Sequence, residues 1–308
     1  DNGILGGEAK PMVLGEEHWE WDHGGDNYVT LIDPNDLDTM YLEGMFGSMA
    51  RKDLKTGKSR GIRPGPAPEG KELRFNWMTP FILSHYDSKT LYAGANMLFK
   101  SENRGDSWRC ISPELSGNLG PERQGDVPFG TITDISESAL KKGLLYAGTD
   151  DGQVHVTMDD GATWSKINNG LPHKWVSRVV ASKYSEGKVF ISLTGYREDD
   201  FEAYLYVSND FGKTWKSLVN NMPSESINVI REDPYDQDIL YVGTELGAYC
   251  SIDNGKTWHS LCKTLPTCAV HDLALHAGTG DLVAGTHGRS AFVLHAREIQ
   301  RMKQEMAK

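Results

Sequence analysis

The sequence predicts an all-β protein: a β-propeller of four-stranded antiparallel blades, with a ring that is incomplete within this chain and a short C-terminal helix. Two repeated patterns and the composition carry this prediction. An apolar run closed by a glycine recurs along the 308 residues, an eight-residue motif recurs after it, and 33 glycines and 13 prolines supply tight turns. Units of short strands bury too little surface alone, so they stack radially into a ring.

The first repeated pattern is the apolar run, which we interpret as the second strand of each blade. Its six copies are 42 to 54 residues apart, a period typical of propeller blades. The copies read "TMYLEG", "TLYAG", "LLYAG", "KVFISLTG", "ILYVG" and "DLVAG", near Tyr41, Tyr92, Tyr146, Phe190, Tyr241 and Val283.

The second repeated pattern is a turn motif that follows the apolar run in four units. It reads "SENRGDSW" from residue 101, "TMDDGATW" from 157, "SNDFGKTW" from 208 and "SIDNGKTW" from 251. Its Ser or Thr and Asp or Asn side chains bond the turn backbone, its glycine takes positive φ, and its tryptophan starts the returning strand. We predict structural roles for Asn103, Trp108, Asp159, Trp164, Asp210, Trp215, Asp253 and Trp258.

A calcium loop is the alternative reading of this motif. Such a loop needs further oxygen ligands and a distal glutamate, and the sequence has neither at the required spacing. No metal site is therefore predicted. Phosphate-binding, zinc-protease and serine-hydrolase motifs are also missing from the sequence, and we predict no cofactor.

The repeats divide the chain into one propeller domain, residues 1–295, and a helix over 296–308. Ile299, Met302 and Met306 share one face of this helix, which we expect to pack on the rim. Residues 1–27 look like the end of an earlier blade, so upstream blades of the same protein or another chain are expected to complete the ring. The predicted blades span about 28–66, 75–113, 131–168, 175–219 and 226–262, with a three-stranded blade at 269–295.

The net charge of −11 disfavours nucleic acid as a partner, because phosphate binding needs clustered Lys and Arg. No apolar run approaches the ~20 residues of a membrane span. Four cysteines without a CxxC pair do not suit zinc. Cys262 and Cys268 enclose a short loop and form either a disulfide in an oxidising compartment or free thiols.

The four turn motifs resemble the Asp-box, or BNR repeat, S-x-D-x-G-x-T-W. Longer stretches are similar to the C-terminal part of large bacterial sortilin-like BNR-repeat propeller proteins. The resemblance implies a bacterial protein outside the cytoplasm, whether secreted, periplasmic or on the cell surface. The stretches that carry it are "RFNWMTPFILS" at 74–84, "LLYAGTDDGQVHVTMDDGATW" at 144–164, "WVSRVVAS" at 175–182, "ILYVGTELGAYCSIDNGKTW" at 239–258 and "DLVAGTHGRSAFVL" at 281–294.

Functional residues are expected on the face opposite the Asp-boxes, where loops join fourth to first and second to third strands. A funnel there would hold a sugar by stacking on Trp77 or Trp175, or a peptide by pairing its termini with arginine and aspartate. Each residue also has a structural alternative, such as capping a turn. The residues expected on this face are His23, Asp26, Asn76, Trp77, Asp150, Asp151, Trp175, Arg178, Tyr196, Arg197, Glu245, His287 and Arg289.

The function expected first is an extracytoplasmic platform that binds a polypeptide or is a subunit of an envelope complex. Asn76, Trp77, Trp175, Arg178, Tyr196, Arg197, His287 and Arg289 are its predicted ligand contacts. The first alternative is a glycoside hydrolase, which needs two carboxylates across the scissile bond; its candidates are Asp26, Asp150, Asp151 and Glu245. The second alternative is a structural assembly factor.

Overall fold

The computed structural model describes residues 4–6, 20–23, 26–117, 125–261, 263 and 265–306. Cys262 lies outside these residues, and Cys268, the other cysteine of the expected loop, is a free thiol in the structure. Within the described ranges, no helix is long and apolar enough to cross a membrane.

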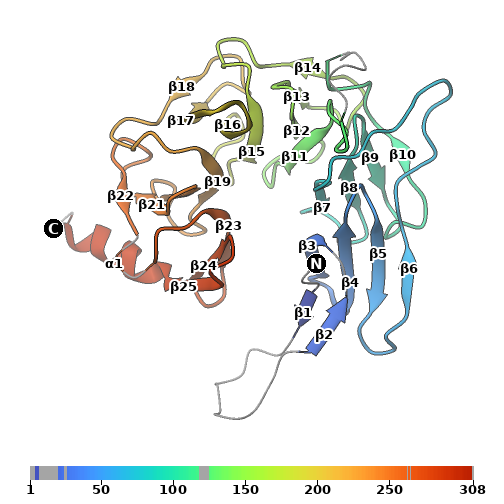
Figure 1. Ribbon diagram of the computed structural model, residues 1–308, viewed down its shortest axis with the longest axis horizontal. Helices are drawn as coiled ribbons and strands as arrows, with labels where there is room; N and C mark the ends of the chain where they lie inside the picture. The colour runs from blue at the N-terminus through green and yellow to red at the C-terminus, as the bar shows by residue number, and fades with distance from the viewer. Residues whose placement is uncertain are drawn as a thin grey trace.

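The described strands form six antiparallel blades arranged around a ring (Figure 1), which confirms the predicted fold class. Blade 1 contains β3 (Asn27–Asp33), β4 (Asp36–Gly44), β5 (Met49–Asp53) and β6 (Ser59–Gly61). Blade 2 contains β7 (Phe81–Leu83), β8 (Leu91–Gly94), β9 (Leu98–Ser101) and β10 (Arg109–Cys110). Blade 3 contains β11 (Ile132–Glu137), β12 (Leu145–Thr149), β13 (Val154–Thr157) and β14 (Ser165–Lys166).

The remaining blades follow in sequence order around the ring. Blade 4 contains β15 (Trp175–Ala181), β16 (Val189–Gly195), β17 (Asp200–Ser208) and β18 (Lys216–Ser217), with the short 3-10 helix η2 (Tyr196–Glu198). Blade 5 contains β19 (Ile227–Glu232), β20 (Leu240–Thr244), β21 (Ala248–Ser251) and β22 (His259–Ser260). Blade 6 has three strands, β23 (Val270–His276), β24 (Asp281–Thr286) and β25 (Ala291–His295), and leads into helix α1 (Ala296–Met306).

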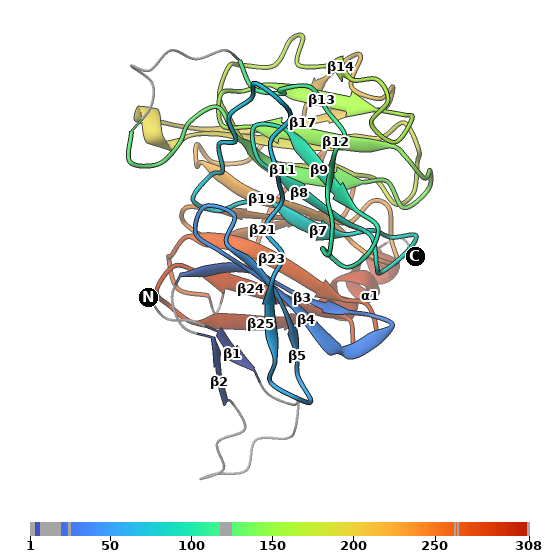
Figure 2. The same ribbon diagram turned by 90° about the vertical axis from the view of Figure 1, so that its right-hand side faces the viewer.

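A two-stranded sheet of β1 (Ile4–Gly6) and β2 (Glu20–His23) precedes blade 1. In the side view it lies level with the lower end of blade 1 (Figure 2). The expectation that further blades complete the ring stays a prediction.

The glycines that close the apolar runs of blades 2, 3 and 5 allow the next blade to pack. A Cβ on Gly148 would lie 2.3 Å from Val176 of blade 4, and a Cβ on Gly243 would lie 2.8 Å from Val270 of blade 6. Real side chains do not approach this closely. The second strands β8, β12 and β20 are buried along their whole length because blades cover both of their faces.

A β-bulge near the start of the innermost strand links successive blades. The register shifts there in β11, β15 and β19, and a bulge re-aims the extra side chain. Thr133 donates to the Val176 carbonyl at 2.7 Å, and Ser177 to the Ile227 carbonyl at 2.7 Å. The Asn228 amide bonds the first carbonyl of blade 6 at 3.4 Å. Each bulge therefore ties its blade to the next one.

The Asp-box closes a hairpin turn and also ties its blade to the preceding one. In the blade 5 copy, the Asp253 carboxylate accepts from the Thr257 backbone N–H at 2.9 Å and from the Ser251 hydroxyl at 2.8 Å. The Trp258 indole donates to the Leu218 carbonyl of blade 4 at 2.8 Å, and Leu218 also packs over Gly255. The indoles of Trp108, Trp164 and Trp215 make the same bond to Ile62, Ile111 and Ile167.

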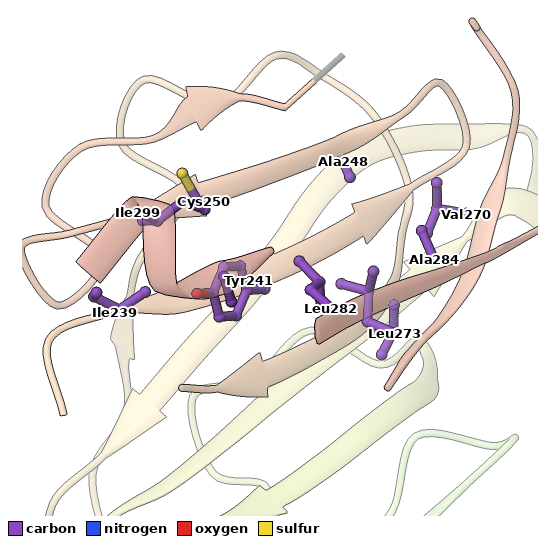
Figure 3. Close-up of a cluster of buried hydrophobic side chains, with 11 residues drawn as sticks. Ile239, Tyr241, Ala248, Cys250, Val270, Leu273, Leu282, Ala284 and Ile299 are labelled. Carbon is purple, nitrogen blue, oxygen red and sulfur yellow. The ribbon is translucent and has the colours of Figure 1, made fainter. Parts of the chain in front are cut away.

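Helix α1 packs against blades 5 and 6. Figure 3 shows Ile299 beside Cys250 and Tyr241 in the buried cluster that also holds Leu282. The predicted apolar face is wrong for Met302 and Met306, which are 58 % and 73 % exposed. Polar contacts orient the helix differently. Gln300 donates to Asp233 at 2.9 Å, and Lys303 pairs with Asp236 at 2.7 Å and Asp238 at 3.0 Å. These bonds turn the face with Ile299, Gln300 and Lys303 toward blade 5.

Candidate functional site

The predicted site residues are held by turns and by the starts of innermost strands. The turn between second and third strands and the Asp-box turn lie at opposite ends of the third strand, so the two sets of residues are on opposite faces of the ring. His23 belongs to β2, whose side chains are outside the description. Asn76 and Trp77 precede β7, Trp175 and Arg178 lie in β15, Tyr196 and Arg197 in η2, and Asp150, Asp151, Glu245, His287 and Arg289 in turns between second and third strands.

A charged cluster brings together the innermost strands of several blades. Arg178 of blade 4 reaches β23 of blade 6, where its guanidinium lies 3.6 Å from Asp272 and donates to the His271 carbonyl at 3.4 Å. Arg231 of blade 5 pairs with the same Asp272 oxygen at 2.7 Å. Blades 4 and 6 are not neighbours, so the Arg178 side chain crosses between inner strands. We call Arg178, Arg231 and Asp272 the inner-strand cluster.

Backbone carbonyls hold both guanidiniums of this cluster in place. Arg178 also donates to the Ser177 carbonyl at 2.8 Å, and Arg231 donates to the Leu273 carbonyl at 2.9 Å and the Ile230 carbonyl at 3.1 Å. The Asp272 side chain is 57 % exposed. A carboxylate reachable from solvent is therefore held between two oriented arginines.

Titratable groups of blades 3, 5 and 6 with shifted pKa values lie at or beside the inner-strand cluster. Burial raises the pKa of Asp134 in β11, an effect opposed by the nearby Arg178 charge. Burial lowers the pKa of Arg231. Burial also lowers the pKa of His271, against the opposing effect of the Glu245 carboxylate. The His271 ring centroid is 5.2 Å from that of His287, so this predicted contact residue lies beside the cluster.

The candidate carboxylates Asp150 and Asp151 bond the turns around them. One oxygen of Asp150 accepts from the backbone N–H groups of Gly130 and Thr131, both at 2.9 Å. Its other oxygen accepts from the Thr131 hydroxyl at 2.6 Å and from Asn76 at 3.3 Å. Asp151 accepts from the Gly117 N–H at 2.6 Å. Burial raises the pKa of Asp150 to about 6.

Glu245 and Asp26 belong to blades other than the one that holds Asp150 and Asp151. Glu245, in blade 5, accepts from the Asn228 amide at 2.9 Å. Asp26, ahead of β3, accepts from the Tyr28 hydroxyl at 3.3 Å. The four carboxylates considered for glycosidase chemistry thus come from three different blades.

The predicted aromatic contacts are packed against neighbours. The Trp77 indole donates to the Tyr28 hydroxyl and meets Phe46 edge to face, with centroids 4.9 Å apart. The Arg197 guanidinium covers the Trp175 ring at 4.6 Å. Tyr196 is 52 % exposed and meets Phe201, with centroids 5.7 Å apart. Tyr196 is therefore the most accessible ring among these three for a stacking ligand.

Glu43 is a residue that the sequence reasoning missed. Its side chain is fully buried in β4 and accepts from the Thr79 backbone N–H at 3.0 Å. Thr79 in turn donates to the Asn76 carbonyl at 3.1 Å, so Glu43 supports the segment with Asn76 and Trp77. Burial raises the pKa of Glu43 to about 8. The available signal was an acidic residue inside the apolar run "TMYLEG".

The repeated sheets, the bulge contacts and the Asp-box turns define an Asp-box β-propeller. The family model described as Sortilin-Vps10 (sortilin, neurotensin receptor 3) matches residues 152–268. Over these residues the chain is similar to the sortilin family. No curated protein matches it.

Solved structures share the fold at low sequence identity. A GH74 xyloglucanase from Xanthomonas campestris is 17 % identical with a TM-score of 0.61, covering 85 % of this chain and 44 % of its own. The extracellular domain of a protein described as a hybrid two-component system from B. thetaiotaomicron is 12 % identical with a TM-score of 0.62, covering 89 % and 34 %. The Niastella koreensis GH74 enzyme is 14 % identical with a TM-score of 0.55, covering 87 % and 51 %. The chain thus spans about a third to a half of these structures, and the likeness concerns the fold.

Proposed function

We propose that this propeller works outside the cytoplasm and binds a polypeptide, with a carboxylate of the ligand held at the inner-strand cluster. The single observation behind this proposal is the convergence of Arg178 and Arg231 from different blades on one exposed carboxylate, Asp272. A guanidinium fork matches a carboxylate better than any other side chain. The extracellular domains among the structural neighbours support the location.

The chemistry of the inner-strand cluster suits a peptide terminus. Two arginines fixed by backbone carbonyls lose little side-chain entropy when an anion arrives, which favours binding. The Asp272 carboxylate offers an acceptor to an amine of the same ligand. The matched family model is described as a receptor, neurotensin receptor 3, and a receptor role is in keeping with this chemistry.

The test is selection from a random peptide pool with free C-terminal carboxylates, followed by fluorescence anisotropy on the selected peptides. We expect Arg178→Gln and Arg231→Gln each to weaken binding by about tenfold or more, because each removes a charge-assisted bond. Amidating the peptide C-terminus is expected to do the same. Lys213→Gln, on the Asp-box face, is the matched control and should bind like the parent.

Equal affinity of the protein for the amidated and the free form of a peptide would contradict the proposal. Affinity that is unchanged in Arg178→Gln would contradict it as well. Thermal unfolding of each variant separates loss of binding from loss of the fold. A variant that unfolds at the parent temperature and no longer binds supports the proposal directly.

A carbohydrate-active propeller is the second candidate, supported by the raised pKa of Asp150, about 6. A carboxyl group whose pKa is raised toward neutral pH suits a general acid. Against this, both Asp150 oxygens bond backbone or hydroxyl groups of the surrounding turns. Release of sugar from xyloglucan by the parent, and its loss in Asp150→Asn, would favour the enzyme. Hydrolysis that survives Asp150→Asn would remove this residue from the mechanism.

A ring-completing blade remains the proposed structural partner. His271 occupies the bulge position in β23, where Thr133, Ser177 and Asn228 bond the following blade. Val293 on the same sheet is 62 % exposed. A photo-crosslinking residue at Val293 should capture another blade in cells that make the protein naturally. The absence of any crosslinked protein after irradiation would contradict this proposal.

A further inference from the structure

A basic pocket lies between blades 1 and 2, on the Asp-box side of the ring. Its volume is about 730 Å³, and all twelve residues that line it are polar or charged. Six carry positive charge and three carry negative charge, in a chain whose net charge is −11. The basic residues of this pocket are Arg51, Lys52, Lys58, Arg60, Lys89 and Arg104.

The arginines of the basic pocket are held in place by neighbouring groups. Arg51 and Arg60 both pair with one oxygen of Asp106, at 3.2 Å and 2.8 Å. Arg51 also donates to the Arg104 carbonyl at 2.9 Å. The Arg104 guanidinium pairs with Asp33 and Asp36, both at 3.2 Å. These contacts place a cluster of oriented donors at one wall of the pocket.

The lysines add charge that has no local counterpart. In the part of the chain that the structure describes, the ammonium groups of Lys58 and Lys89 form no ion pair, although both line the pocket. Both residues are exposed. An anion in the pocket would therefore meet positive charge on more than one side.

The Asp-box of blade 2 differs from the other three copies at positions that line the pocket. Asn103 stands where the other three copies have aspartate, and Arg104 stands where they have Asp, Phe or Asn. Asp106 stands where they have Ala, Lys and Lys, which offsets part of this gain in positive charge. The Asn103 side-chain oxygen accepts from the Ser107 N–H at 2.9 Å, as Asp159 accepts from the Thr163 N–H at 2.8 Å. The turn therefore forms with either residue.

We propose that the basic pocket binds the oxyanion of a small phosphate or sulfate monoester. Arginine and lysine are the side chains that recognise such groups, and the pocket volume is within the range of ligand sites. The pocket has no aromatic lining, which disfavours a ligand held by base or sugar stacking. Its lining comes from blades 1 and 2, whereas the inner-strand cluster comes from blades 4, 5 and 6, so the two proposed sites are independent.

The experiment is isothermal titration of the full chain with glucose 6-phosphate, glucose 6-sulfate, inorganic phosphate, inorganic sulfate and glucose. We expect both esters to bind at low ionic strength, glucose to give no heat, and affinity to fall as salt screens the charges. The inorganic ions distinguish a site for the ester from a site for the free anion. Lys58→Gln and Arg60→Gln should each weaken ester binding by about tenfold.

One further variant comes from the other Asp-boxes. Asn103→Asp restores the residue of the other copies, adds a negative charge beside the pocket, and should weaken ester binding several-fold without unfolding the turn. Lys216→Gln, exposed on β18, is the control and should bind like the parent.

Absence of heat with both esters overturns the proposal. Affinity that is unchanged in both Lys58→Gln and Asn103→Asp also overturns it, because the pocket would then not be the site. Binding of the inorganic ions without the esters overturns the ester assignment. Ester binding with the expected order of variants supports it.

Discussion

Replacing Glu43 by glutamine should stabilise the folded chain at neutral pH. Glu43 is fully buried in β4 and its pKa is raised from 4.5 to about 8 by burial. The folded protein therefore keeps a proton on this carboxyl at pH 7, whereas the unfolded chain releases it. Glutamine keeps an oxygen acceptor for the Thr79 N–H and carries no charge at any pH.

The sign and size of the effect follow from the two pKa values. A raised carboxyl pKa contributes stability that is fully present below the unfolded pKa of 4.5 and is lost as the pH rises toward 8. One pH unit in this window changes the free energy of unfolding by about 1.4 kcal/mol. At pH 7 the loss reaches about 3 kcal/mol, which Glu43→Gln should recover.

Urea unfolding of the parent and Glu43→Gln between pH 4.5 and 8 tests this reasoning. The difference in free energy of unfolding between the two should grow with pH, because effects of all other groups cancel. Glu69→Gln, an exposed position, is the matched control and should show a flat difference. A difference for Glu43→Gln that does not change with pH would refute the assignment of a protonated buried carboxyl.

Two further predictions concern the folded core. Burial lowers the pKa of His155 from 6.5 to about 4. The free energy of unfolding therefore falls by up to about 3 kcal/mol as the pH falls from 6.5 toward 4. His155→Gln should flatten that part of the profile of stability against pH, and an unchanged slope would contradict this. Trp258→Phe removes the indole bond to the Leu218 carbonyl from a residue that is 4 % exposed, and should cost about 2 to 4 kcal/mol in urea unfolding. A cost near zero would show that the Asp-box tryptophan does not hold blades 4 and 5 together.

The fold was predictable because its repeats are written in local chemistry. Each apolar run ends in a glycine, and in blades 2, 3 and 5 the following blade packs against it, as Gly148 shows with Val176. Each Asp-box combines a turn glycine with a tryptophan that starts a strand. These residue types act within a few positions of one another, so a pattern along the chain is sufficient to reveal them.

The candidate site was predictable only in part. The expected turns do carry Asp150 and Glu245, but their oxygens bond neighbouring backbone and side-chain groups. The inner-strand cluster includes one residue named from the sequence, Arg178. Arg231 and Asp272 lie within strands whose sequences show only the usual alternation of apolar and polar residues. A bulge in the innermost strands of blades 3 to 6 changes which way their side chains face, and no local pattern marks the bulge.

The sequence by itself determined the class of protein, the blade repeat and the hairpin role of the Asp-box, because turn formation and strand alternation depend on neighbouring residues. Only the tertiary structure decided that Glu43 is buried, that Arg178 crosses to blade 6 and that Arg51 and Arg60 share Asp106. These contacts join residues from distant parts of the chain. Burial and charge pairing at such distances arise from how the blades pack around the ring.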